Sequence, residues 1–276
     1  MVRTPKIKIK QVDHYYELHG TGPTLVFVHG AFVDADMWVP QIEYFSSRYR
    51  VLTYDLRGHG RTGVSDLSAY GIVTFTDDLA ALLDVLEIEN PILCGLSLGG
   101  MIAQSYAVQY PERLKALVLA DTAVSVNLTL SDKLQRYVLF PRWAMLMTIR
   151  MMSMEKFTRF SFWLARATRS GEWFGEDKRT QDYVERCMLQ MNDKEYLKIY
   201  GAIYDFKLQP LEKIRCPTLV LNGEHESKSV FRHTEEILRR VPQAEAEIVP
   251  GAGHTSNMEN PEAFNRLVGS FLKRCV

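Results

Sequence analysis

Short, nearly continuous runs of apolar residues recur along the chain and are separated by longer segments with helical periodicity. Such runs are typical of strands in a parallel sheet, because these strands are buried on both faces. Six runs fit this description, at residues 24–28, 49–54, 91–94, 117–120, 218–221 and 246–249. Residues 7–10 differ, since they alternate strictly between isoleucine and lysine, and residues 14–18 offer a second short strand. We therefore expect an antiparallel hairpin at one edge of the sheet.

Helical patterns lie between these runs. Residues 76–86 place four leucines on one face of a helix, and further helices are predicted over residues 101–110, 231–241 and 261–271. Strands that alternate with helices indicate an α/β fold, with a mostly parallel sheet and helices on both of its faces.

The alternation stops between residues 123 and 210, where no strand-like run occurs and aromatic residues and methionine are dense. These residues are Phe140, Trp143, Met145, Met147, Met151, Met152, Met154, Phe157, Phe160, Phe162, Trp163, Trp173 and Phe174. We interpret residues 123–210 as a helical cap, inserted between two core segments at 1–122 and 211–276. Part of its apolar surface would form a small core, and part would line an apolar pocket.

The strongest chemical signal is the pattern Gly-Leu-Ser-Leu-Gly at residues 95–99. It follows a predicted strand and leads into a predicted helix. A serine on such a turn has a strained backbone and an exposed hydroxyl. The N-terminus of the helix also directs free N–H groups toward this point. Ser97 is therefore the candidate nucleophile.

A serine hydroxyl is a weak nucleophile at neutral pH and needs a base. His254 ends the pattern Gly-Ala-Gly-His after the last predicted strand, so we expect it at the same edge of the sheet as Ser97. The segment His-Gly-Ala-Phe at residues 29–32 follows the first buried run. The backbone N–H groups of Ala31 and Leu98 are predicted to form an oxyanion hole.

Together these segments resemble the α/β-hydrolase superfamily over nearly the whole chain. The shared segments are residues 29–30, Trp38, the Asp-Leu-Arg-Gly-His-Gly-Arg loop at 55–61, and residues 95–100, 217–223 and 251–254. The resemblance implies an α/β-hydrolase fold with a cap and the chain order nucleophile, acid, base. It assigns no chemistry to Asp55. A serine nucleophile excludes epoxide hydrolases and haloalkane dehalogenases, which use aspartate, and the glycine-proline motif of proline iminopeptidases is absent. We also predict Phe32 and Trp38 as substrate-binding residues.

The resemblance places the triad acid after the predicted strand at residues 218–221, three residues beyond Gly223. Glu226 occupies this position, where most relatives have aspartate. Glutamate is one methylene longer, so its loop must sit further back to keep the hydrogen bond in range. Glu224 in the same loop and Asp121, which follows the preceding strand, remain the alternatives.

Composition narrows the expected partners. Lys and Arg together number 33, as do Asp and Glu, so the overall charge does not indicate nucleic acid or an anionic membrane surface as partner. We find neither a signal peptide nor an apolar run of about 18 residues, and therefore expect no membrane span. The four cysteines (Cys94, Cys187, Cys216 and Cys275) lack metal-ligand spacing. We expect a cytoplasmic protein with free thiols and without a metal or cofactor.

These features predict an enzyme that hydrolyses carboxylic esters of small to medium apolar substrates through an acyl-enzyme intermediate, with lactones as the nearest variant. Two other functions use the same residues. One is a ligand-binding receptor that retains the triad, and the other is a cofactor-free perhydrolase or haloperoxidase that uses peroxide as acceptor. Turnover of p-nitrophenyl esters distinguishes the enzyme from the receptor, and addition of hydrogen peroxide and halide identifies the perhydrolase. The oligomeric state is left open.

Overall fold

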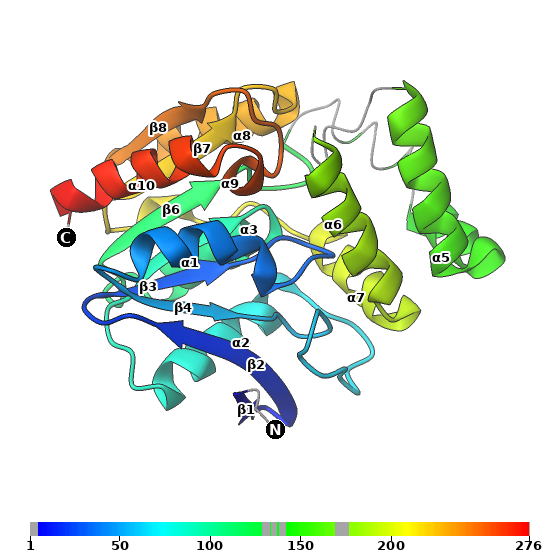
Figure 1. The fold of residues 1–276 in the computed structure, drawn as a ribbon, viewed down its shortest axis with the longest axis horizontal. Helices are drawn as coiled ribbons and strands as arrows, with labels where there is room; N and C mark the ends of the chain where they lie inside the picture. The colour runs from blue at the N-terminus through cyan, green and yellow to red at the C-terminus, as the bar shows by residue number, and fades with distance from the viewer. Residues whose placement is uncertain (1–4, 129–132, 134–136, 138–141, 169–176, 276) are drawn as a thin grey trace.

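The computed structural model describes residues 5–128, 133, 137, 142–168 and 177–275. Eight strands form one sheet in the order β1-β2-β4-β3-β5-β6-β7-β8 (Figure 1). The strands are β1 (Lys6–Ile9), β2 (Val12–His19), β3 (Thr24–Val28), β4 (Arg50–Tyr54), β5 (Ile92–Leu96), β6 (Ala116–Ala120), β7 (Thr218–Gly223) and β8 (Ala244–Val249). β2 pairs antiparallel with β1 and β4, and every pairing from β4 to β8 is parallel. The predicted edge hairpin and mostly parallel sheet are confirmed.

Helices cover both faces of the sheet, as predicted (Figure 1). One face packs against α2 (Ile72–Val85), α3 (Leu98–Gln109) and α8 (Lys228–Arg240), and the other against α1 (Val39–Phe45) and α10 (Pro261–Cys275). In β3, Val26 and Val28 face the first layer, while Leu25 and Phe27 face the second. All four are fully buried, which explains the unbroken apolar runs of the sequence.

One boundary matters for the site. Helix α3 begins at Leu98, three residues before the predicted start, so Ser97 is its N-terminal capping residue. β5 likewise extends to Leu96, beyond the predicted end at residue 94. Strand and helix are thus joined by Ser97 alone, a shorter turn than the sequence pattern indicated.

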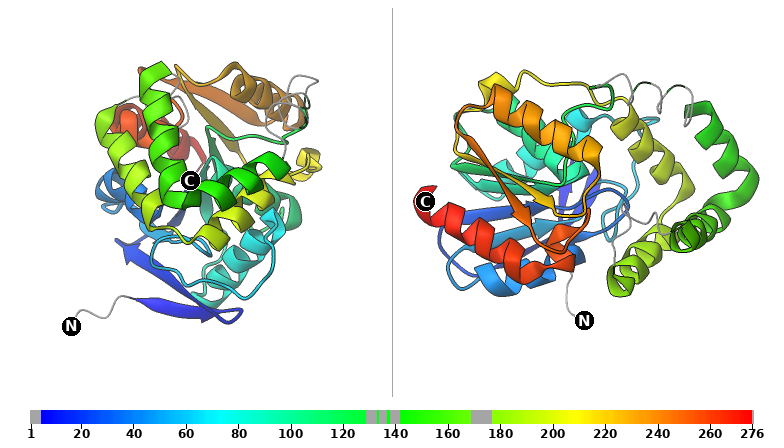
Figure 2. Two further views of the ribbon diagram at one scale, coloured as in Figure 1. Left: turned by 90° about the vertical axis from the view of Figure 1, so that its right-hand side faces the viewer. Right: turned by 90° about the horizontal axis from the view of Figure 1, so that it is seen from above.

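Between β6 and β7 the described residues contain helices α5 (Arg142–Thr168), α6 (Lys178–Gln190) and α7 (Asp193–Tyr204), and no strand. α6 and α7 lie beside the carboxyl ends of the strands, and α5 lies outside them (Figures 1 and 2). α5 bends at Ser153, where φ is 63° and ψ is 157°. This arrangement suits a cap over the strand ends. The boundaries at 123 and 210 remain a prediction, and Phe140, Trp173 and Phe174 lie outside the described residues.

No helix within the described part of the chain combines the length and the apolar character needed to cross a membrane.

Candidate active site

Ser97 forms the turn between β5 and α3, with φ 54° and ψ −114°. A residue other than glycine is strained in this region of backbone space. Two hydrogen bonds hold it there: the Ser97 N–H donates to the Ala120 carbonyl at 2.9 Å, and the Thr122 hydroxyl donates to the Ser97 carbonyl at 2.7 Å. The end of β6 therefore fixes the strained backbone of the turn.

The glycines around Ser97 allow three elements to approach one another. A Cβ atom on Gly95 would lie 2.2 Å from the carbonyl oxygen of Gly99, and a Cβ on Gly99 would lie 2.0 Å from the carbonyl oxygen of Val28. Both distances are far below van der Waals contact. The glycines of this pattern are thus required for the packing of β5, α3 and β3, and the serine between them is the candidate nucleophile.

Three loops at the carboxyl edge of the sheet bring Ser97, His254 and Glu226 together. The Nε2 atom of His254 lies 3.0 Å from the Ser97 Oγ, and its Nδ1 lies 2.5 Å from Oε2 of Glu226. The other oxygen of Glu226 accepts the N–H of Ser227 at 2.6 Å. Both carboxylate oxygens are therefore engaged, which fixes the orientation of the acid toward the imidazole.

The two alternative acids bind other groups. Asp121 accepts hydrogen bonds from the N–H of Gly223 at 2.8 Å and from the hydroxyl of Ser256 at 2.5 Å. Glu224 accepts the N–H of Gly251 at 2.8 Å. Glu226 is thus the candidate acid whose carboxylate contacts the imidazole directly.

The three ionisable groups shift one another's pKa values. Burial alone would lower the pKa of His254, but the charge and hydrogen bond of Glu226 outweigh it and raise that pKa above its usual value. Burial alone would raise the pKa of Glu226, but the interaction with His254 lowers it. Burial, reinforced by repulsion from Glu226, raises the pKa of Asp121 to about 8. Glu226 therefore holds the negative charge beside the imidazole near neutral pH.

The loop after β3 passes directly beside Ser97. A Cβ atom on Gly30 would lie 3.7 Å from the Cβ of Ser97. His29 supports this loop from below: its Nδ1–H donates to the Gly30 carbonyl at 2.7 Å, and its Nε2 accepts the N–H of Leu56 at 2.9 Å. Ala31 follows in this loop, and Leu98 opens α3, where the first N–H groups of a helix have no acceptor within it. Both predicted oxyanion donors thus belong to segments that flank Ser97.

The two predicted substrate contacts have different surroundings. Phe32 is half-buried with φ 64°, and its ring stacks on Tyr196 of α7 with centroids 4.3 Å apart. Trp38 ends the 3₁₀ helix η1 (Ala35–Trp38) and is fully buried, stacked on Phe27 at 4.7 Å. This position corrects the prediction for Trp38, because its large indole fills the core between β3 and α10 instead of facing the site.

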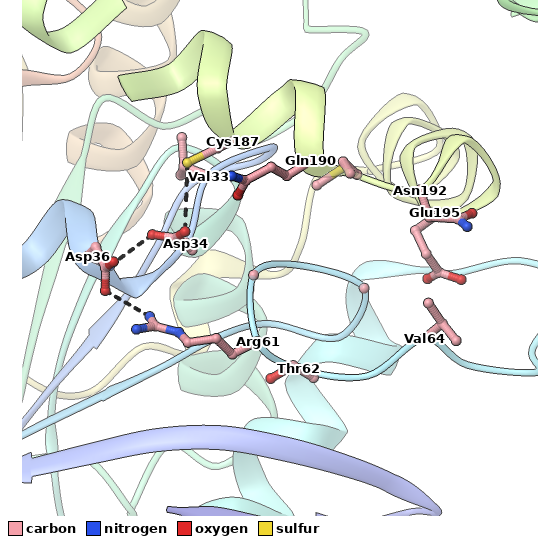
Figure 3. A pocket seen from close by; sticks show the side chains of 13 residues that line it. Val33, Asp34, Asp36, Arg61, Thr62, Val64, Cys187, Gln190, Asn192 and Glu195 are labelled. Atoms are coloured by element: carbon pink, nitrogen blue, oxygen red, sulfur yellow. Dashed lines mark hydrogen bonds and ion pairs between the residues drawn. The ribbon is translucent and has the colours of Figure 1, made fainter. Parts of the chain in front are cut away.

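A cavity of about 350 Å³, lined by polar and apolar residues in similar measure, lies between the loops after β3 and β4 and the helices α6 and α7 (Figure 3). Its lining includes Asp34, Asp36, Arg61 and Glu195, and it does not include Ser97. Arg61 pairs with Asp36 at 2.8 Å and with the buried Asp55 at 2.9 Å, so much of the charge is neutralised within the protein. This cavity differs from the expected apolar pocket, which remains a prediction. Asp55, to which the resemblance assigns no chemistry, is held inside the protein by its ion pair with Arg61.

Known proteins resemble this chain over most of its length. Residues 23–261 match the family described as the alpha/beta hydrolase fold. The 3-oxoadipate enol-lactonase 2 of Acinetobacter baylyi is 27% identical over 258 residues, covering 91% of this chain and 89% of that protein. Carboxylesterase YbfK of Bacillus subtilis is 27% identical over 256 residues, covering 91% and 80%. The crystal structure of the enol-lactonase from Burkholderia xenovorans LB400 has a TM-score of 0.81 at 25% identity, covering 98% of this chain and 100% of that one.

The family match spans strands β3 to β8, the Ser97 turn and the His254 loop. The strand order and the helices on both faces agree with it. The chain therefore belongs to the α/β-hydrolase fold family.

Proposed function

We propose that this protein is a serine hydrolase that cleaves carboxylic esters and lactones of small to medium apolar substrates through an acyl-enzyme intermediate. The observation that carries the proposal is the hydrogen-bonded series from Ser97 through His254 to Glu226. The enol-lactonase and carboxylesterase relatives, which match over most of both chains, support the same class of reaction.

In the first half of the reaction, the Ser97 Oγ attacks the carbonyl carbon while Nε2 of His254 takes the hydroxyl proton. Glu226 accepts the Nδ1–H of the imidazole, which selects the tautomer with Nε2 free and stabilises the imidazolium that forms. The N–H groups of Ala31 and Leu98 stabilise the negative charge on the substrate oxygen. Collapse of the tetrahedral intermediate breaks the bond to the alcohol, which leaves with the proton from His254.

In the second half, water attacks the acyl group on Ser97 and His254 takes a proton from that water. Collapse returns the proton to the Ser97 Oγ and releases the carboxylic acid. With a lactone, the alcohol and the acid belong to one molecule, so a single hydroxy acid leaves. Esters with different leaving groups and lactones of different ring size are thus cleaved by the same residues.

The test compares the wild type with Ser97→Ala on a panel of p-nitrophenyl esters and acyl lactones. We expect turnover and labelling by a fluorophosphonate probe in the wild type, and loss of both in a Ser97→Ala protein whose circular dichroism is unchanged. Labelling that persists in Ser97→Ala would refute the nucleophile. Tight binding of an apolar ligand without turnover would favour the receptor, and activity only with peroxide and halide would favour the perhydrolase.

A further inference from the structure

Helix α5 exposes large apolar side chains to solvent. Trp143, Met147 and Met151 recur every four residues along its first arm, with exposed fractions of 69%, 50% and 79%. On the second arm, beyond the bend, Phe160 and Trp163 are 48% and 62% exposed, and their rings stack with centroids 5.9 Å apart. Exposed apolar side chains of this size, grouped on each arm of the helix, indicate a binding surface. We call these five side chains the α5 surface.

The opposite face of α5 is packed within the protein. Ile149, Met154 and Phe162 are buried and share a core cluster with residues of α6 and α7. The helix therefore does not need the α5 surface in order to hold its place. Both arms lie at the front of the left view in Figure 2, outside α6 and α7, so α5 forms the outer side of the molecule there.

The charge of α5 departs from that of the whole chain. Residues 142–168 contain five Lys or Arg residues and one Glu, a net charge of +4, whereas the chain as a whole is neutral. Lys156 and Arg159 are exposed on the same arm as Phe160 and Trp163. A helix that combines exposed Trp and Phe with Lys and Arg is typical of segments that lie in the interface of an anionic bilayer.

Two of these basic side chains have acidic partners. Arg142 pairs with Asp205 at 2.9 Å and Arg159 pairs with Glu155 at 3.1 Å. All four side chains are exposed, and such ion pairs are weak enough to exchange for another anion, such as a lipid phosphate. A second copy of this chain is a poorer partner, because it would bring another helix of net charge +4 against the first.

We propose that the α5 surface docks this protein onto anionic lipid bilayers. The five apolar side chains enter the boundary between headgroups and acyl chains, and Arg142, Lys156 and Arg159 face the lipid phosphates. α5 packs on α6 and α7, which lie beside the strand ends, so docking brings this edge of the sheet near the bilayer. The proposal goes beyond the proposed hydrolase activity and does not depend on it.

The test uses co-sedimentation with vesicles of phosphatidylcholine and phosphatidylglycerol, and with vesicles of phosphatidylcholine alone. All proteins carry Ser97→Ala, so hydrolysis cannot alter the vesicles. The test variant is Trp143→Glu/Met151→Glu/Trp163→Glu. The matched control is Val73→Glu/Val85→Glu/Leu238→Glu, which adds the same charge at exposed apolar positions of α2 and α8.

We expect binding to the anionic vesicles that weakens as salt is raised, with weaker binding to the neutral ones. The test variant should lose about ten-fold or more in vesicle affinity, and the control should stay within about three-fold. Tryptophan emission should shift to shorter wavelength on the anionic vesicles, and Trp143→Phe/Trp163→Phe should lose this shift. This second measurement tests the surface even if the triple variant is unstable.

Absence of sedimentation with anionic vesicles, or equal affinity of the test variant and the control, would overturn the proposal. So would a wild-type dimer that the test variant converts to a monomer without any vesicle binding, since the α5 surface would then join two copies. Labelling of Ser97 by fluorophosphonate in the wild type is independent of these results. Failure of the docking proposal is therefore distinguishable from failure of the hydrolase proposal.

Discussion

Glu226 is the predicted triad acid and is one methylene longer than the aspartate that the sequence resemblance leads us to expect there, and its second hydrogen bond accounts for how it fits. The carboxylate is anchored by the N–H of the next residue, Ser227, while its other oxygen reaches His254. The loop between β7 and α8 thus accommodates the additional methylene of the Glu226 side chain. A fixed carboxylate is what the triad mechanism needs from its acid.

The first prediction concerns the identity of this acid. Glu226→Gln should lower kcat by about 10⁴-fold, because an amide cannot stabilise the imidazolium and favours the wrong tautomer. Asp121→Asn, which is isosteric, should keep kcat within about ten-fold, since Asp121 binds Gly223 and Ser256 instead. Steady-state kinetics with one p-nitrophenyl ester compares the two. An inactive Asp121→Asn beside a nearly active Glu226→Gln would move the acid to the end of β6.

The second prediction concerns pH. Only the neutral imidazole of His254 can accept the Ser97 proton, so kcat/KM should rise with pH through the pKa of His254. Glu226 raises this pKa, and the midpoint should lie above the 6.5 of a free imidazole. In Glu226→Gln the charge is lost, the imidazolium is less stable, and the midpoint should move to lower pH. A pH profile of the residual activity measures it, and an unchanged midpoint would contradict this account.

The position of some site residues could be predicted from the sequence, and that of others could not. Ser97 and Glu226 follow the buried strands β5 and β7, and His254 follows the edge strand β8. Because the carboxyl ends of parallel strands share one edge of the sheet, the proximity of these three residues was predictable. Trp38 was not, because it ends a short 3₁₀ helix whose rotation about its axis no pattern reveals. Its burial depends on contacts with Phe27 and Phe264, which come from distant parts of the chain.

At the scale of elements, α6 and α7 hold the loop that carries the predicted oxyanion donor Ala31. The Tyr183 hydroxyl of α6 donates to Asp34 at 2.7 Å, and Tyr196 of α7 stacks on Phe32, whose φ of 64° is strained. No sequence motif marks Tyr183 or Tyr196, because the position of an inserted helix relative to the core is a tertiary property. The helical segment thereby becomes part of the site's geometry.

The third prediction tests this link. Tyr196→Leu removes a stacking contact of about 0.5–1.5 kcal/mol and should relax the strained backbone at Phe32. If the oxyanion donors move, kcat should fall by about two- to ten-fold with little change in KM. Tyr196→Phe keeps the ring and should retain the wild-type kcat. Equal losses in both variants would show that the hydroxyl, and not the stack, carries the effect.

At the scale of the whole molecule, apolar runs and their periodicity were sufficient to predict the sheet, its edge hairpin and the two helical layers. They were insufficient for α5, because apolar residues occur on both of its faces. Their spacing therefore does not show which face is buried and which is exposed to solvent. Met147 and Met151 are exposed while Met154 is buried, although all three are methionines of the same helix and the sequence does not distinguish them. The net charge of the whole chain is zero, so it likewise does not reveal that one helix carries a net charge of +4.

A buried ion pair lies next to the loop after β4 and affects the stability of the whole molecule through the cost of breaking it. The Arg57 guanidinium donates two hydrogen bonds of 2.7 Å to Asp78, and both side chains are buried. The pair joins the 55–61 loop to α2. A buried pair gains little over an apolar replacement of similar volume, yet loss of one partner leaves an uncompensated charge in the core.

The last prediction follows from that asymmetry. Asp78→Asn should lower the free energy of unfolding by about 3–5 kcal/mol, because the guanidinium stays buried without its carboxylate. The double variant Arg57→Met/Asp78→Leu removes both charges and should be more stable than Asp78→Asn. Urea unfolding monitored by circular dichroism measures all of them, with the single variants Arg57→Met and Asp78→Leu as the remaining corners of the cycle. If the two single losses simply add in the double variant, Arg57 and Asp78 do not interact, and the 55–61 loop must be held by the Asp55–Arg61 contacts instead.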